Sequence, residues 1–401
     1  MSNDTQPEIR FPGFTEAWEQ RKVFELGEII TGNTPSTGNK DYYKGQYLFV
    51  SPADIQDNRY VSKTNTTLTE LGFKTGRFIR KGSTLFVSIG STIGKVGQAD
   101  RDLITNQQIN SIIPSNDYDD NFVYSILLGK SAKIKQLAAT QAVPIINKTE
   151  FGKTIINVPS FEEQIKIGTF FKQLDDTIAL HQRKLDLLKE TKKGFLQKMF
   201  PKNGAKVPEV RFPGFTEDWE QRKLGDIFKK DIQKNKDLEF NSDSVISVAK
   251  MKLSTPSAKS LDEYMKTYNK IWKGNIAFEG HTNDEFPNGR FVLNDCQDGI
   301  VSHIYDVYSA VDEYDNEFMK RYINNPYVMR KILINATSSA RMMKSLNSVE
   351  FLKQSILLPI LSEQQKIGGF FYQLDNIIAF HQRKLDLLKE TKKGFLQKMF
   401  V

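Results

Sequence analysis

The segment that decides the fold is His181–Phe200, HQRKLDLLKETKKGFLQKMF, because His381–Phe400 repeats these 20 residues without a change. A second repeated pair lies further upstream in each half. Ile9–Lys22 (IRFPGFTEAWEQRK) and Val210–Lys223 (VRFPGFTEDWEQRK) agree at 12 of 14 positions. Both pairs are offset by 200 or 201 residues, so the chain is a tandem duplication of one unit.

The repeated segments near the end of each half predict a coiled coil. Their apolar residues, taken together with two polar positions in each copy, alternate spacings of four and three, a period of 3.5 that is typical of coiled-coil seams. The apolar seam residues are Ile167, Phe171, Leu174, Ile178, Leu185, Leu188, Ile367, Phe371, Leu374, Ile378, Leu385 and Leu388. We expect two helices of about 40 residues, each roughly 60 Å long. They should pair antiparallel within one chain, around a pseudo-two-fold axis; a parallel pairing between two chains is the alternative.

Four polar residues interrupt this pattern: His181, His381, Lys192 and Lys392. We interpret them as residues that fix the register and orientation of the helices. Histidines that sense pH or bind a metal are the alternative, but no Cys, Asp or second His lies nearby at metal-binding spacing. Each helix is expected to open with a capping box, Ser160–Glu163 in the first copy and Ser362–Gln365 in the second.

The stretches between the repeated segments, 23–158 and 224–358, are nearly equal in length and differ strongly in sequence. Short apolar or alternating runs, broken by Gly, Asn and Pro, predict strands, and patches at 120–137 and 316–334 predict helices. The expected fold class is mixed α/β (α+β), with two similar domains separated by the two long helices. The expected bounds are 1–158 for the first domain, 159–200 for the first helix, 201–358 for a linker and the second domain, and 359–401 for the second helix.

Composition narrows the functional classes. The net charge of +8 is concentrated in 181–202 (net +5) and 381–401 (net +4), which suits a polyanionic partner, although solvated helix faces explain it equally well. No run of 18 apolar residues and no signal peptide is present, so we expect no membrane association. The single cysteine, Cys296, fits a reducing compartment, and the cytoplasm is the expected location.

Motifs for catalysis are incomplete. Gly90–Lys95 (GSTIGK) resembles a P-loop but is one residue short and lacks the Ser or Thr that binds magnesium. Asn324–Tyr327 (NNPY) resembles a loop of adenine methyltransferases but lacks its first proline. Four scattered histidines and one cysteine offer no nucleophile–base pair and no zinc site. We therefore expect no catalytic residues and no bound metal.

The arrangement of these segments resembles the specificity subunits of type I restriction–modification systems. The resemblance rests on Arg-Phe-Pro-x-Phe near the start of each half, a variable domain, and a helix rich in Glu and Gln, all repeated once. Further similar features are Thr31–Ser36 (TGNTPS), the Lys-Gly pairs at 81–82 and 273–274, Ser160–Gln164 (SFEEQ) and Leu361–Gln365 (LSEQQ). It covers the whole chain.

The resemblance implies a fold, partners and cofactors. The variable stretches would be target-recognition domains, each reading one half of a bipartite, asymmetric site in double-stranded DNA. The helices would set the gap between half-sites and bind two methyltransferase subunits, with restriction (translocase and nuclease) subunits outside. The chain itself would bind no cofactor; S-adenosylmethionine would belong to the methyltransferase subunits, and ATP with Mg²⁺ to the restriction subunits.

Candidate DNA-contacting residues lie in loops rich in Asn, Gln, Lys, Arg and aromatic side chains, which pair with base edges. In the first domain they are Asn39, Lys40, Tyr42, Tyr43, Lys74, Arg77, Lys95, Gln107 and Gln108. In the second domain they are His281, Asn283, Arg290, Ser338, Ser339, Arg341 and Lys344. For each of them, an ordinary exposed loop residue is the alternative interpretation, and the sequence favours it for any single position. The alternative functions are a structural coiled-coil adaptor without DNA readout and a solitary DNA methyltransferase or nuclease.

Overall fold

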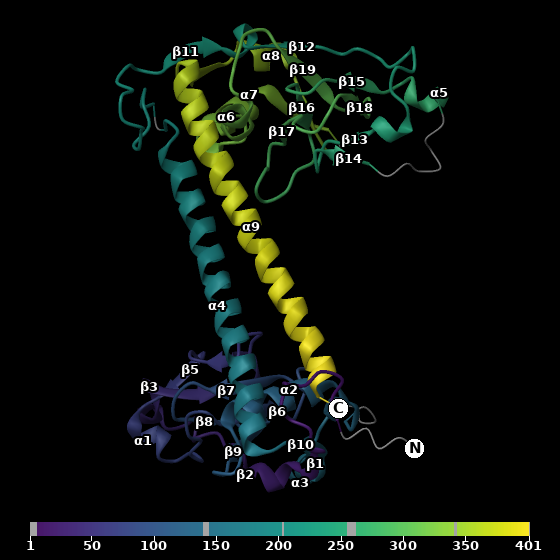
Figure 1. The fold of residues 1–401 in the computed structure, drawn as a ribbon. Coiled ribbons are helices and arrows are strands. Elements are labelled where there is room, and N and C mark those ends of the chain that lie inside the picture. Colours follow the sequence, from purple (N-terminus) through teal and green to yellow (C-terminus); the bar gives the residue numbers. More distant parts are fainter. Residues whose placement is uncertain (1–5, 139–143, 203, 255–261, 341–342, 401) are drawn as a thin grey trace. The chain divides into compact units, whose positions relative to one another are not determined.

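The computed structural model describes residues 6–138, 144–202, 204–254, 262–340 and 343–400. The chain divides into two compact units: unit 1 joins the residues up to Lys184 to those from His381 onward, and unit 2 runs from Leu185 to Phe380. The two long helices are α4 (Phe161–Lys198) and α9 (Leu361–Met399) (Figure 1). Each unit therefore contains one variable stretch, the first part of one long helix and the last part of the other.

Unit 1 is mixed α/β. Its strands are β1 (Glu19–Lys22), β2 (Gly27–Thr31), β3 (Tyr43–Val50), β4 (Tyr60–Val61), β5 (Thr66–Leu68), β6 (Thr84–Val87), β7 (Val96–Ala99), β8 (Leu103–Thr105), β9 (Ile109–Pro114) and β10 (Ile155–Val158). Its shorter helices are α1 (Glu70–Phe73), α2 (Asp120–Gln136) and α3 (Lys148–Lys153). The main sheet has the order β2-β9-β6-β7-β4, beside a three-stranded sheet β5-β3-β8 and a β1-β10 pair. Helix α2 packs on β6 and β7.

Unit 2 repeats this plan with smaller secondary sheets. Its strands are β11 (Glu220–Lys223), β12 (Phe228–Lys230), β13 (Ile246–Ser247), β14 (Lys252–Leu253), β15 (Asn269–Ile271), β16 (Ile276–Glu279), β17 (Arg290–Leu293), β18 (Gly299–Val301), β19 (Asp306–Ala310), β20 (Thr337–Ala340), β21 (Met343–Leu346) and β22 (Ser355–Leu358). Its shorter helices are α5 (Asp262–Met265), α6 (Asn316–Tyr322), α7 (Pro326–Ala336) and α8 (Ser348–Lys353). The sheet order β12-β19-β16-β17 matches β2-β9-β6-β7 of unit 1.

Two aspartates at corresponding places in the variable stretches, Asp119 and Asp315, are helix caps. The Asp119 carboxylate accepts from the Phe122 amide at 2.8 Å and begins α2, and Asp315 accepts from Phe318 at 2.7 Å and begins α6. Such a side chain satisfies one of the free N–H groups of a helix's first turn. These residues recur because the framework needs them, while the loops between are free to differ.

The core of each unit includes the end of a long helix. Phe400 of α9's C-terminal extension packs against Trp18 and Phe171 in unit 1, with ring centroids 6.4 and 5.5 Å away. Phe200, at the identical place in the first copy, packs against Phe318 and Phe371 in unit 2, at 5.8 and 6.1 Å. Both phenylalanines are buried. The repeated 20-residue segment thus fits two domains of different sequence.

The long-helix segments run antiparallel in each unit. In unit 1, Phe170 meets Phe395 at 5.0 Å between ring centroids, and His181 meets His381 with 3.0 Å between their Nδ1 atoms. In unit 2, Phe370 meets Phe195 at 5.0 Å. All twelve apolar seam residues predicted from the 3.5-residue period are buried or half-buried. The predicted antiparallel pairing within one chain is confirmed in each unit.

The predicted capping boxes are wrong in detail. Helix α9 begins at Leu361, so Ser362 lies inside the first turn and cannot be its N-cap. At the start of α4, the Glu163 carboxylate is taken by Arg10, whose Nε and Nη2 atoms lie 2.8 Å from its two oxygens. A capping box needs that carboxylate on the backbone of the cap residue. The Glu-Gln pair therefore serves tertiary contacts instead.

Those contacts attach each variable domain to its long helix. Arg211 pairs with Glu363 at 2.7 and 2.8 Å, as Arg10 does with Glu163, and both glutamates are fully buried. Gln164 donates to Pro159 O and accepts from the Asp119 amide, and Gln364 makes the same two contacts in unit 2. The Arg-Phe-Pro and Glu-Gln motifs are thus two sides of one joint. None of the described helices combines the length and the apolar character needed to cross a membrane.

Candidate nucleic-acid interface

In unit 1 the loop Thr31–Ser36 forms hydrogen bonds with the loops that contain Arg77 and Gln107, and these loops together form one surface. Asn33 accepts from the Arg77 amide at 2.9 Å, and the Arg77 guanidinium donates to Thr31 O at 2.6 Å. On the other side, Thr34 donates to the Gln107 side chain at 2.7 Å. These bonds hold the ends of β2 and β8 and the segment after α1 together.

Most of the sequence-predicted residues of unit 1 lie on this loop cluster. The Tyr43 hydroxyl donates to Pro35 O at 2.7 Å, Asn39 caps the short 3-10 helix that contains Lys40 and Tyr42, and Tyr42 O accepts from the Thr69 amide. Lys40, Lys74, Arg77 and Gln107 are exposed. Lys74 pairs with Glu70 at 2.7 Å, one turn back in the same segment. The structure therefore brings seven of the nine candidates together.

Of the other two candidates of unit 1, Lys95 lies in the turn between β6 and β7, and Gln108 lies just before β9, beside the end of β6. Lys95 donates to Ile55 O at 3.1 Å, and Gln108 O accepts from the Ser88 amide at 2.8 Å. The P-loop-like residues form this turn, with Gly90 and Gly94 both at positive φ. The turn is tight and opens no helix, so the phosphate-wrapping geometry of a P-loop is missing here.

In unit 2 the candidates gather where β16 ends. Lys344 donates its amide to Gly280 O at 2.8 Å, which places the hairpin β20–β21 beside the loop after β16. A Cβ at Gly280 would lie 2.1 Å from Lys344 O, so only glycine allows this approach. The exposed side chains of His281, Asn283 and Ser338 are on this surface. Ser339 pairs with Lys344 in the hairpin, but its side chain and the whole of Arg341 lie outside the described residues.

The Arg290 guanidinium is engaged on two sides by groups of unit 2. Its Nε donates to the buried Glu279 carboxylate at 2.7 Å, its Nη2 donates to Ala249 O at 2.8 Å, and the Phe286 ring lies 5.1 Å away. These contacts tie the β13–β14 turn and the loop before β17 to the main sheet. Among the described residues, Arg290 therefore holds neighbouring loops of unit 2 in place through its contacts with Glu279 and Ala249.

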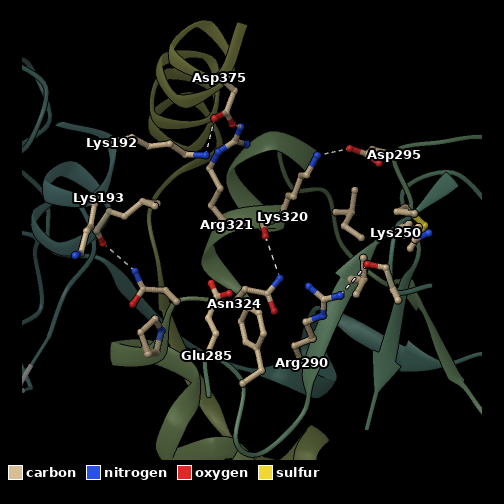
Figure 2. Close-up of a pocket in the computed structure, with 18 of the residues that line it drawn as sticks. Lys192, Lys193, Lys250, Glu285, Arg290, Asp295, Lys320, Arg321, Asn324 and Asp375 are labelled. Carbon is tan, nitrogen blue, oxygen red and sulfur yellow. Dashed lines mark hydrogen bonds and ion pairs between the residues drawn. The ribbon is translucent and has the colours of Figure 1, made fainter. Parts of the chain in front are cut away.

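Arg290 also lines a groove of about 840 Å³ in unit 2 (Figure 2). The groove lies among the end of α4, the junction of α6 and α7, the β13–β14 turn and the start of β17. Seven cationic and three anionic side chains line it. Asn325 of the NNPY segment caps α7 and donates to Leu196 O at 3.0 Å, so this segment fastens a domain helix to α4.

An aspartate in each long helix makes a junction that the sequence-based residue choice missed. Asp175 lies 2.5 Å from Lys392 Nζ and 3.2 Å from Arg59 Nη1. Asp375 lies 2.5 Å from Lys192 Nζ and 2.6 Å from Arg321 Nη2. The recurrence of Asp and Lys at an offset of 200 could have indicated these pairs. Nothing in the sequence marks the arginines, since Arg59 precedes β4 whereas Arg321 lies on α6.

The histidines and acidic residues do not assemble a metal site within the described part of the chain. Among these residues, no three His, Cys, Asp or Glu side chains are arranged to hold a metal ion. The two histidines of unit 1 face each other in the helix pair, where a hydrogen bond between two Nδ1 atoms requires one donor and one acceptor. This arrangement accords with their interpretation as register residues.

Sequence comparisons with known proteins agree with this repeated architecture. A family model described as the type I restriction modification DNA specificity domain matches residues 15–190 and again 216–390. The MjaIX specificity subunit of a type I restriction enzyme from Methanocaldococcus jannaschii is 23% identical, over 95% of this chain and 92% of its own length. The HindI specificity subunit from Haemophilus influenzae is 31% identical over 40% of this chain and 37% of its own length.

Solved structures share the fold over the whole chain. The S subunit of a type I system from M. genitalium superposes with a TM-score of 0.63 at 14% identity, covering 99% of both chains. A chain from a structure of type I complex assembly and conformational transition gives a TM-score of 0.53 at 15% identity, covering 98% of both. At these identities the likeness concerns the fold.

Proposed function

The chain belongs to the type I restriction–modification DNA specificity family, and we propose that each of its two units reads one half of a bipartite, asymmetric DNA site. The chain is accordingly a DNA target-recognition subunit. One observation carries the proposal of two different half-sites. Identical helix segments and shared joints support two domains whose exposed loops differ, as expected if a reader was duplicated and each copy then changed its target.

The loop clusters are the proposed reading surfaces. In unit 1 the cluster presents Lys40, Arg77 and Gln107, and in unit 2 it presents His281 and Asn283, all exposed. Amide and cationic side chains make the bidentate contacts that distinguish base pairs in the major groove. Hydrogen bonds within the loops, some of them made by these same side chains, fix the loops, so that the exposed side chains are presented by a rigid support.

The chain is proposed to have no catalytic activity of its own. It would hold two methyltransferase subunits, which bind S-adenosylmethionine, and restriction subunits, which use ATP and Mg²⁺. Support for partner subunits comes from family membership and from the neighbour whose structure describes assembly of a type I system. Calorimetry on the purified chain should detect no binding of S-adenosylmethionine; micromolar binding would contradict this part.

Domain replacement tests the central proposal. Residues 224–358 are exchanged for the corresponding stretch of a relative, and methylated sites are mapped across the genome. One half-site should change while the other stays as it was. The reciprocal exchange of 23–158 is the control and should change only the other half-site. If either exchange changed both half-sites, or if it changed neither, the assignment of one domain to one half-site would be rejected.

A further inference from the structure

The groove of unit 2 carries an excess of positive charge that the loop clusters do not explain. Part of that charge is neutralised internally. Lys192 and Arg321 share Asp375, while Lys320 pairs with Asp295 (Figure 2). These pairs link α4, α6 and α9 and form a fixed, nearly neutral wall. They position the groove and leave little charge for a ligand.

Three other lysines of the groove are available. Lys193, Lys250 and Lys252 are exposed, and none of them makes an ion pair with a described residue. Lys193 comes from α4, whereas Lys250 and Lys252 come from the turn and strand on the other side of the groove. A lysine ammonium is a strongly hydrated point charge that binds phosphate without demanding a particular geometry.

We infer that this groove binds the sugar–phosphate backbone of duplex DNA beside the half-site that unit 2 reads. The inference rests on the proposed function and deepens it. Lys193, Lys250 and Lys252 each contact backbone phosphate. The contacts of Arg290 with Glu279 and Ala249 hold the β13–β14 turn, which carries Lys250, against the main sheet.

Two features favour an extended polyanion over a small anionic ligand. A small-molecule site surrounds most of its ligand with converging donors. Here the free cations are exposed and come from separate walls, an arrangement that suits charges spread along a strand. The groove is also continuous with the proposed reading loop, because Phe286 and Arg290 at the end of that loop line it. A duplex held by His281 and Asn283 would present its backbone to the lysines.

Phosphate contacts of this kind position DNA and carry no sequence information. Removing one lysine–phosphate pair should reduce the slope of log affinity against log salt by about 0.9. The triple variant Lys193→Ala, Lys250→Ala, Lys252→Ala should therefore show a slope that is smaller by roughly 2 to 3 units. Its affinity should fall by a similar factor for cognate and for unrelated duplexes.

The duplication supplies a matched control. Lys393 occupies the same place as Lys193 in the identical repeated segment, belongs to unit 1 and is not among the residues that line this groove. Lys193→Ala should lower the salt slope, whereas Lys393→Ala, with the same change of net charge, should leave it close to wild type. The full-length chain is titrated with fluorescent duplexes between about 50 and 200 mM salt, the range over which phosphate contacts dominate. Thermal unfolding checks that each variant is folded.

The outcomes separate the inference from the function on which it rests. Unchanged slopes in the triple variant, with wild-type binding intact, would overturn the groove as a DNA site. Equal reductions for Lys193→Ala and Lys393→Ala would also overturn it, since general charge would then explain the effect. Weaker association with a partner subunit at an unchanged slope would assign the groove to an acidic protein segment. Failure of the wild-type chain to bind duplex DNA, alone or with methyltransferase subunits, would reject the proposed function itself.

Discussion

The carboxylate of Asp175 forms ion pairs with Lys392 of the other long helix, at 2.5 Å, and with Arg59 of the variable domain, at 3.2 Å. The three groups are mostly buried, with side-chain exposures of 7%, 14% and 1%. The Arg59 guanidinium also donates to Gln98 and Asn121 and lies 4.3 Å from the Tyr124 ring. One carboxylate therefore couples the domain to both helices of unit 1.

Replacing Asp175 with Ala should destabilise unit 1 by about 3–5 kcal/mol, because two buried cations would be left without their shared anion. The neighbouring Asp176 is the control; its exposed pair with Lys172 should contribute only about 0.3–0.5 kcal/mol. Urea unfolding is followed by the fluorescence of Trp18, after the other two tryptophans, Trp219 and Trp272, are replaced by Phe. Equal destabilisation by the two aspartate variants would contradict the coupling role.

The Arg10–Glu163 joint should be as important as its copy in unit 2. Arg10→Ala leaves a fully buried Glu163 carboxylate without its cation and should cost about 3–5 kcal/mol in unit 1. Arg211→Ala should cost a similar amount in unit 2, because Glu363 is equally buried. Trp18 reports the first effect, and Trp219 reports the second in a chain that lacks the other tryptophans. A difference of more than about 2 kcal/mol, the width of the range expected for breaking a buried ion pair, would show that the joints are unequal.

The histidine pair predicts a pH dependence. Burial lowers the pKa of His381, and the nearby charges of Lys184 and His181 lower it further. A folded-state pKa below the unfolded value of about 6.5 means that the unfolded chain binds the proton first as pH falls. This histidine should therefore contribute its full stabilisation of unit 1 above about pH 6.5, and the contribution should be lost progressively as the pH falls below that value.

His381→Gln should reduce that dependence, since the group that takes up the proton on unfolding is gone. The exposed His303 provides the control, and His303→Gln should leave the slope for unit 1 unchanged. The measurement is the urea midpoint of Trp18 fluorescence at a series of pH values. A wild-type slope in His381→Gln would show that other groups cause the pH dependence.

The sequence predicted the helix seam well because periodicity and exact repetition are local patterns. Ile167 and Phe371, for example, lie where the 3.5-residue period placed them. Helix starts were less accurate: Ser362 lies inside the first turn of α9, and Glu163, the acidic residue of the Ser160 motif, pairs with Arg10. Loop residues such as Arg77 were chosen by type, and their grouping follows from hydrogen bonds between loops far apart in sequence.

The Asp175 and Asp375 junctions could not be predicted in full. Arg59 and Arg321 occupy different places in the two domains, on a loop before β4 and on helix α6. Only folding brings the Arg59 guanidinium to Asp175 of α4 and the Arg321 guanidinium to Asp375, the corresponding residue of α9. The partition of each long helix between two units was equally hidden, because identical segments give no sign of which domain they contact.

That partition gives the last prediction. Phe400 and Phe200 are the same residue in the identical segment, and each is buried in a different unit. Removing either ring leaves a cavity and should cost about 3–5 kcal/mol. Phe400→Ala should lower the urea midpoint reported by Trp18 and leave Trp219 unchanged, and Phe200→Ala should do the reverse. Single-tryptophan chains measure each transition. If Phe400→Ala instead lowered the Trp219 midpoint, the C-terminal segment would belong to unit 2. The assignment of the end of α9 to unit 1 and of the end of α4 to unit 2 would then be wrong.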